Sequence, residues 1–80
     1  MAYYLEQIKT QPDGKATATV ESYPDDLTAE IFYHAALNTN LRLVQSESLK
    51  AYYANVHTES GVKLMERRRE VVEPEPPVTE

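Results

Sequence analysis

The sequence predicts an α+β domain of plan strand-strand-helix-strand-strand, with a four-stranded, mainly antiparallel sheet and one helix packed on one face. Three observations predict this class. Segments typical of strands lie towards both ends of the chain, an amphipathic segment lies between them, and turn residues separate the segments. Eighty residues, 41% of them apolar and 26% charged, are typical of one small globular domain. We place this domain at residues 1–71.

The first two strands are expected to form a hairpin. Residues 2–10 carry Tyr and Leu side chains, and Gln11-Pro12-Asp13-Gly14 supplies turn residues before the segment 16–21. In that second strand small apolar and polar side chains alternate, so one face should be buried and the other wet. The expected buried set is Ala16, Ala18 and Val20, and the expected wet set is Thr17, Thr19 and Glu21.

A helix is predicted from about Asp26 to about Thr39. Pro24 interrupts the extended segment, and Asp25 and Asp26 place carboxylates at the positive end of the helix. The run 38–40, Asn-Thr-Asn, is expected to end it, because Asn tolerates the left-handed cap.

Two apolar stripes run along this predicted helix, and one of them must pack on the sheet. The second stripe is open to two interpretations: it is a contact surface, or its leucines tuck under the following connector. The first stripe is Leu27, Ile31 and Ala35 with Phe32 beside it, and the second is Tyr33, Leu37 and Leu41.

The third and fourth strands are predicted at 49–57 and 62–71, joined by the loop Glu59-Ser60-Gly61. The strand order stays open. The second and third strands lie side by side in parallel, or the hairpins join through their outer strands. Residues 72–80 are rich in Pro and Glu, so a solvated, disordered acidic tail is expected there.

Charge and cysteine content limit the cellular compartments and the kinds of partner that we expect for this protein. The chain has eight Lys and Arg, thirteen Asp and Glu, and no Cys. Three of the acids lie in 73–80, so the remaining body is nearly neutral and has little long-range attraction for nucleic acid or for anionic membranes. No apolar run approaches the ~20 residues that span a bilayer. We expect a cytoplasmic protein without a membrane partner.

The two histidines give little support for metal or acid–base chemistry. His34 follows Glu30 by four residues, which is typical of a surface pair on a helix, and His57 lies on a distant strand. The sequence also has no glycine-rich phosphate loop and no nucleophile elbow. We therefore predict no metal, no cofactor and no enzymatic activity.

Six tyrosines and no tryptophan favour a contact surface. The pairs at 3–4 and 52–53 must each send one ring to each face of the sheet. Exposed tyrosines suit protein contacts, although cross-strand stiffening explains any single ring as well. The predicted partner-binding residues are Tyr3, Tyr53, Tyr33, Leu37 and Leu41.

One basic cluster supports an alternative function. Strand alternation places Lys63, Arg67 and Arg69 on one face. Such a row beside exposed tyrosines would form a phosphate track for nucleic acid. The adjacent glutamates argue against this interpretation, and so does the role of an edge strand, in which charge blocks pairing between sheets.

The order of these segments resembles small proteins of unknown function encoded by phages and integrated mobile elements of gut Firmicutes. The resemblance rests on Tyr-Tyr-Leu-Glu near the start, the Asp-Gly turn, 22–25 leading into the helix, the loop 59–61 and the acidic Pro-rich tail. Those relatives have an aromatic–His pair in the helix, here His34 with Tyr33 or Phe32. The resemblance implies an accessory protein that acts by binding. The function predicted is a non-catalytic interaction module whose partner is another protein or a second copy in a homodimer.

Overall fold

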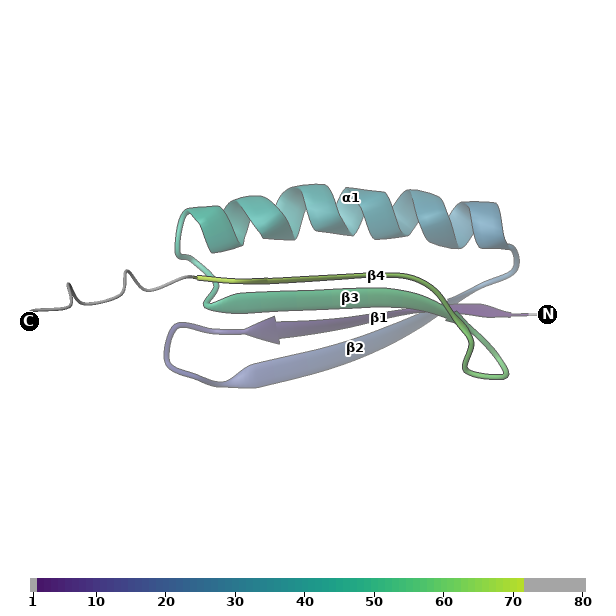
Figure 1. Ribbon diagram of the computed structural model, residues 1–80, viewed down its shortest axis with the longest axis horizontal. Coiled ribbons are helices and arrows are strands. Elements are labelled where there is room, and N and C mark those ends of the chain that lie inside the picture. The colour runs from purple at the N-terminus through teal and green to yellow at the C-terminus, as the bar shows by residue number, and fades with distance from the viewer. Residues whose placement is uncertain (1, 72–80) are drawn as a thin grey trace, which may run out of the picture.

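The computed structural model describes residues 2–71 and confirms the predicted order of elements (Figure 1). The elements are β1 (Tyr3–Thr10), β2 (Ala16–Tyr23), α1 (Asp26–Gln45), β3 (Ala51–Thr58) and β4 (Lys63–Glu70). The tail predicted at 72–80 lies outside the described residues. Within residues 2–71, no helix has the length and apolar character needed to cross a bilayer.

The four strands form one antiparallel sheet in the order β2-β1-β3-β4, so the two hairpins join through β1 and β3. This arrangement differs from both layouts left open by the sequence. The composition of the strands explains it. β3 has no formally charged residue and takes a central place, whereas six of the eight residues of β4 are charged and suit a solvated edge.

Helix α1 begins where predicted and ends six residues later. Asp25 caps it, because its Oδ1 accepts a hydrogen bond from the Thr28 N–H at 2.7 Å. Asn40 does not end the helix; its Nδ2 donates to the Ala36 carbonyl at 2.7 Å from inside it. The helix ends in a Schellman motif, with Glu47 at φ 63° and the Ser48 N–H donating to the Leu43 carbonyl at 2.8 Å.

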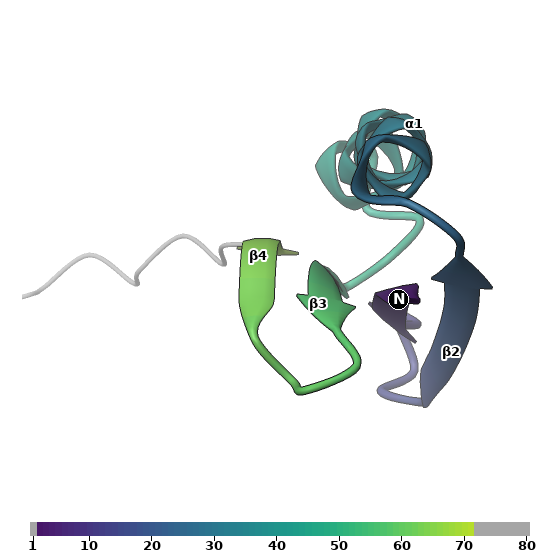
Figure 2. The same cartoon turned by 90° about the vertical axis from the view of Figure 1, so that its right-hand side faces the viewer.

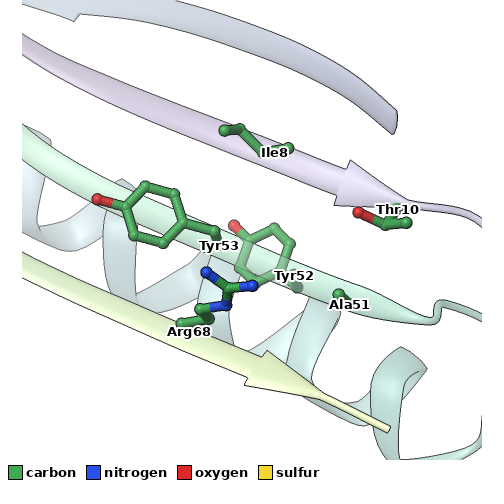
Figure 3. Close-up of a pocket in the computed structure, with 6 residues that line it drawn as sticks. All are labelled: Ile8, Thr10, Ala51, Tyr52, Tyr53 and Arg68. Atoms are coloured by element: carbon green, nitrogen blue, oxygen red, sulfur yellow. The ribbon is translucent and has the colours of Figure 1, made fainter. Parts of the chain in front are cut away.

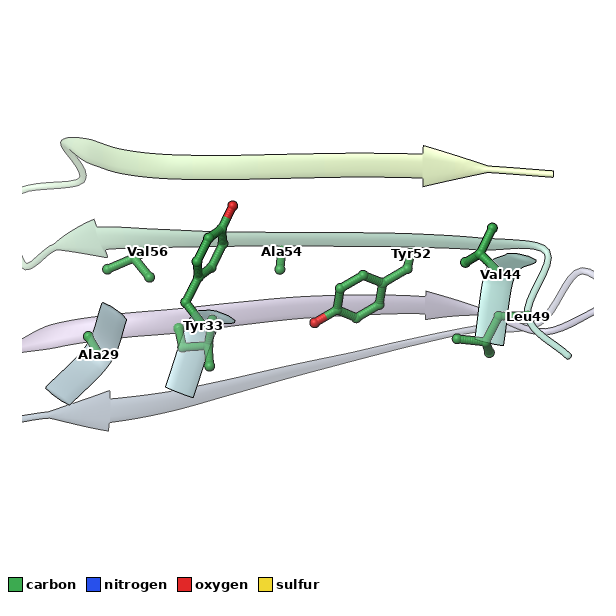
Figure 4. Close-up of a cluster of buried hydrophobic side chains, with 8 residues drawn as sticks. Ala29, Tyr33, Val44, Leu49, Tyr52, Ala54 and Val56 are labelled. Carbon is green, nitrogen blue, oxygen red and sulfur yellow. The ribbon is translucent and has the colours of Figure 1, made fainter. Parts of the chain in front are cut away.

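The single helix covers one face of the sheet, and the end-on view shows no described element on the other face (Figure 2). We call the uncovered side the open face. Between the helix and the sheet, Tyr33 from α1 lies against β3, where Tyr52 and Ala54 are buried (Figure 4). Burial raises the pKa of Tyr52 to about 12, and its hydroxyl donates to Gln7 Oε1 at 2.7 Å. The buried apolar core consists of Leu5, Ala29, Tyr33, Val44, Leu49, Tyr52, Ala54 and Val56.

The predicted buried face of β2 is wrong. Leu5 faces the helix, so the neighbouring positions Glu6 and Ile8 face away from it, and their partners across the ladder are Val20 and Ala18. Val20 is therefore on the open face, with 55% of its surface exposed. The reason is register: β1 must turn Leu5 to the helix, and pairing then fixes the faces of β2.

Candidate interaction surfaces

The β3 half of the open face carries a hydrogen-bonded polar network around Asn55. Asn55 is 2% exposed, and its Nδ2 donates to Glu6 Oε1 at 3.0 Å and to the Tyr53 hydroxyl at 3.2 Å. Its Oδ1 lies 2.7 Å from His57 Nδ1. The His57 ring stacks on Tyr4, with centroids 5.5 Å apart. These contacts satisfy a buried amide that would otherwise destabilise the fold.

The network continues to β4 through Tyr53. The Tyr53 hydroxyl donates to Glu66 Oε2 at 2.7 Å, and Lys63 Nζ lies 3.3 Å from the same oxygen. The Tyr53 hydroxyl and the Lys63 ammonium lower the pKa of Glu66. The acids and bases of this half are thus paired with one another. The arrangement stiffens the sheet and leaves its carboxylates committed to internal partners.

Small apolar side chains lie on the β1–β2 half of the same face. Ile8 and Ala18 are cross-strand partners, and Val20 lies further along β2. Beside them a shallow hollow of about 370 Å³ lies between Ile8 and Arg68, with Tyr53 between the two (Figure 3). The open face therefore carries a polar network centred on β3 and a smaller apolar area at Ile8, Ala18 and Val20.

The tyrosine pairs send one ring to each face, as the sequence predicts. Tyr52 is buried in the core, and Tyr53 lies on the open face with its hydroxyl tied to Glu66. Tyr3 packs against the core on the helix side, so Tyr4 supplies the open-face ring of the first pair. Of the two predicted contact tyrosines that belong to these pairs, Tyr3 and Tyr53, only Tyr53 is on the open face.

In the structure the second stripe of the helix faces the core, and the first stripe is exposed. The prediction that Tyr33 lies on an exposed stripe is wrong, because its side chain is 4% exposed within the core. Leu37 and Leu41 are partly buried against the same core. The physical reason is volume: Tyr33 fills the space above Ala54, where a smaller residue would leave a cavity.

The first stripe, and not the second, supplies the most exposed apolar residues of the helix. Leu27 is 63% exposed, Ile31 58% and Phe32 50%. Phe32 stacks on Tyr23 at the end of β2, with ring centroids 5.0 Å apart. Of these three residues, Phe32 therefore supplies exposed apolar surface next to β2.

A bulge divides the predicted basic row. Val56 pairs with Met65, but His57 pairs with Lys63, so Leu64 is an extra residue in β4. The bulge turns Lys63 to the open face, where it meets Glu66. The prediction that Lys63 shares a face with Arg67 and Arg69 is wrong.

Arg67 and Arg69 lie on the helix side of β4. They line a groove with Arg42 from α1, a residue that the sequence placed after the end of the helix. Burial raises the pKa of the Tyr33 hydroxyl, and the Arg67 guanidinium opposes this rise.

The histidines lie on opposite sides of the sheet. His34 Nε2 is 3.5 Å from Glu30 Oε1 on the exposed side of α1, which confirms the predicted surface pair. His57 belongs to the open face. Residues 2–71 hold no cluster of three or more His, Asp or Glu arranged to bind a metal ion.

The two edges of the sheet differ sharply in charge. β4 carries six charged residues in eight, whereas β2 carries only Glu21, and seven of its eight residues are exposed. Charged side chains are a common protection against strand pairing between molecules. β4 has this protection and β2 lacks it.

The Asn55 network and Arg42 were missed in the sequence. Glu6 and Asn55 are far apart in the chain, and only the β1–β3 register makes them partners. Arg42 was missed because the Asn-Thr-Asn run predicted that the helix ends at about Thr39. The helix in fact continues to Gln45 and includes Arg42.

The fold and these surfaces define a two-layer α+β domain with an uncovered sheet face and one unprotected edge. No protein-family model matches the chain, and neither the curated proteins nor the solved structures contain a match to it.

Proposed function

We propose that this protein is a non-catalytic protein-interaction module that self-associates by pairing β2 with β2 of a second copy. The observation that carries the proposal is the difference in charge between the two edge strands. β2 has eight residues, seven of them exposed, and only one charge, whereas β4 has six charges in eight residues. An exposed strand offers unpaired N–H and C=O groups to another strand, and charge on β4 opposes such pairing there.

The sequence of β2 suits pairing with itself. In an antiparallel pair centred on Thr19, Ala18 lies opposite Val20 and Thr17 lies opposite Glu21 of the other copy. The only charge of the strand then avoids its own counterpart. A two-fold axis perpendicular to the sheet relates the copies, so the result is one continuous eight-stranded sheet with both helices on one face.

Apolar surface next to β2 extends the contact. A groove of about 300 Å³ between α1 and β2 is lined in part by Tyr23, Phe32 and Ala35. The half-exposed Phe32 borders this groove. A core of eight buried apolar residues is thin, and domains of this size commonly gain stability from oligomerisation.

Lysine substitutions on the two faces of β2 test the proposal. Thr19→Lys and Val20→Lys place a charge on opposite faces of the same edge, and each should weaken self-association at least about tenfold through like-charge repulsion at the dyad. Sedimentation velocity over a wide protein concentration range gives the dissociation constant, and far-UV circular dichroism checks the fold.

Leu64→Lys is the matched control, because Leu64 is 46% exposed on the already charged strand β4. It should leave association unchanged. A wild-type chain that stays monomeric at the highest concentration rules the proposal out. If Val20→Lys dissociates the dimer and Thr19→Lys does not, the open face and not the edge makes the contact.

The resemblance to proteins of phages and mobile elements supports an accessory role of such a module in a mobile element. This origin rests on the sequence alone and stays a prediction.

A further inference from the structure

A groove of about 290 Å³ lies between the last two turns of α1 and the helix-side face of β4, and we call it the arginine groove. Its lining combines three guanidinium groups, two side-chain amides and one apolar side chain. The residues are Asn38, Leu41, Arg42, Gln45, Arg67 and Arg69. The groove brings Arg42 beside residues that are 25 or more positions away in sequence.

The charges of the arginine groove lack carboxylate partners among residues 2–71. The ion pairs within 4 Å in this part of the chain join Glu30 with His34, Lys63 with Glu66 and Arg68 with Glu70. None of them includes a groove arginine. On the open face of β4 every base is paired, at 3.3 Å for Lys63 and 2.7 Å for Arg68.

Structural roles explain the arginines singly but not together. Arg42 lies in the last turn of α1, where a cation is favourable at the negative end of the helix. Arg67 and Arg69 protect an edge strand, a role that Arg68 already fills while paired with Glu70. Three like charges that line one hollow repel one another, and a bound anion would offset this repulsion.

We propose that the arginine groove binds a compact anion bearing adjacent phosphate groups, of the pyrophosphate class. The planar guanidinium group donates two parallel hydrogen bonds to phosphate oxygens, and the side-chain amides of Asn38 and Gln45 are neutral donors in the same lining.

The net charge of the body favours a compact anion over a nucleic acid. Of the thirteen acids only three lie in 73–80, so the rest of the chain carries ten acids against eight bases, a net charge of −2. A long polyanion would extend beyond the groove onto a body that offers it no net attraction, whereas a small oxyanion contacts the groove alone.

Titration of the full-length chain with sodium pyrophosphate at low salt tests the proposal. Isothermal calorimetry gives the affinity, and the side-chain amide NMR signals of Asn38 and Gln45 should shift on binding. Arg67→Gln and Arg69→Gln should each weaken binding roughly tenfold or more, because each removes a charge-assisted hydrogen-bonding group.

Arg68→Gln is the matched control: the same residue type on the same strand, turned to the opposite face and paired with Glu70. It should leave the affinity unchanged, and thermal unfolding should show all three variants folded. Absence of pyrophosphate binding overturns the proposal, and so does an equal loss in Arg68→Gln.

Two further probes identify the ligand class. Glutarate, a dicarboxylate, should bind at least tenfold more weakly than pyrophosphate; equal binding overturns the phosphate assignment. If a single-stranded oligonucleotide binds much more tightly than pyrophosphate, and its binding weakens steeply as salt rises, the proposal is overturned. The ligand is then a nucleic acid and not a compact anion.

Discussion

Tyr33 and Phe32 are neighbours in the chain with opposite environments. Tyr33 is 4% exposed and fills the space between helix and sheet, whereas Phe32 is 50% exposed and contacts Tyr23. Both are aromatic residues in one amphipathic helix, so the sequence left open which one is buried. Helical phase relative to the sheet decides this, and the phase is a tertiary property.

Replacing each of these two residues by alanine should show which ring is buried in the core and which is at the surface. Tyr33→Ala should lower the free energy of unfolding by about 3 kcal/mol or more, because it leaves a cavity in the core. Phe32→Ala should lower it by about 1 kcal/mol, the typical value of an aromatic pair contact. Urea unfolding followed by circular dichroism measures both. A larger loss for Phe32→Ala than for Tyr33→Ala would contradict the placement of the stripes.

At the scale of elements, the start of α1 can be predicted from the sequence, but its end cannot. The start is readable in sequence, since Asp25 is an N-cap residue and accepts the Thr28 N–H. The end is hidden, because the Schellman motif places Glu47 and not a glycine at a positive φ of 63°. Asn40, a residue typical of helix ends, is inside the helix and 4% exposed.

Glycine at position 47 should stabilise the protein. A non-glycine residue in the left-handed region costs about 1 kcal/mol, and Glu47→Gly removes most of this cost. Glu47→Ala is the control, since it removes the carboxylate and keeps the backbone penalty. Thermal unfolding should show a higher midpoint for Glu47→Gly alone. An equal rise in Glu47→Ala would assign the effect to the side chain.

At the scale of the whole molecule, the sheet order determines which surfaces are available. The central strands β1 and β3 carry Leu5, Ala54 and Val56 under the helix. The outer strands remain exposed, one charged and one nearly neutral. The edge proposed for self-association and the arginine groove therefore lie at opposite edges of the sheet, at β2 and at β4, so each is testable without disturbing the other.

Self-association through β2 should make thermal stability depend on protein concentration. Mass action stabilises a folded dimer against unfolded chains, so the midpoint of unfolding should rise as the concentration increases. Scanning calorimetry at several concentrations measures this. Val20→Lys should remove the dependence and Leu64→Lys should keep it. A wild-type midpoint that is constant over the range would speak for a monomer.

The sequence by itself determined the fold class, the order of the five elements, the start of the helix and the split of each tyrosine pair between two faces. These features depend on local signals: turn residues, an N-cap carboxylate and the two-residue period of a strand. Only the tertiary structure decided the strand order, the buried stripe of α1, the open face of β2 and the separation of Lys63 from Arg67. Each of these depends on the register between distant segments, and local sequence periods do not encode that register.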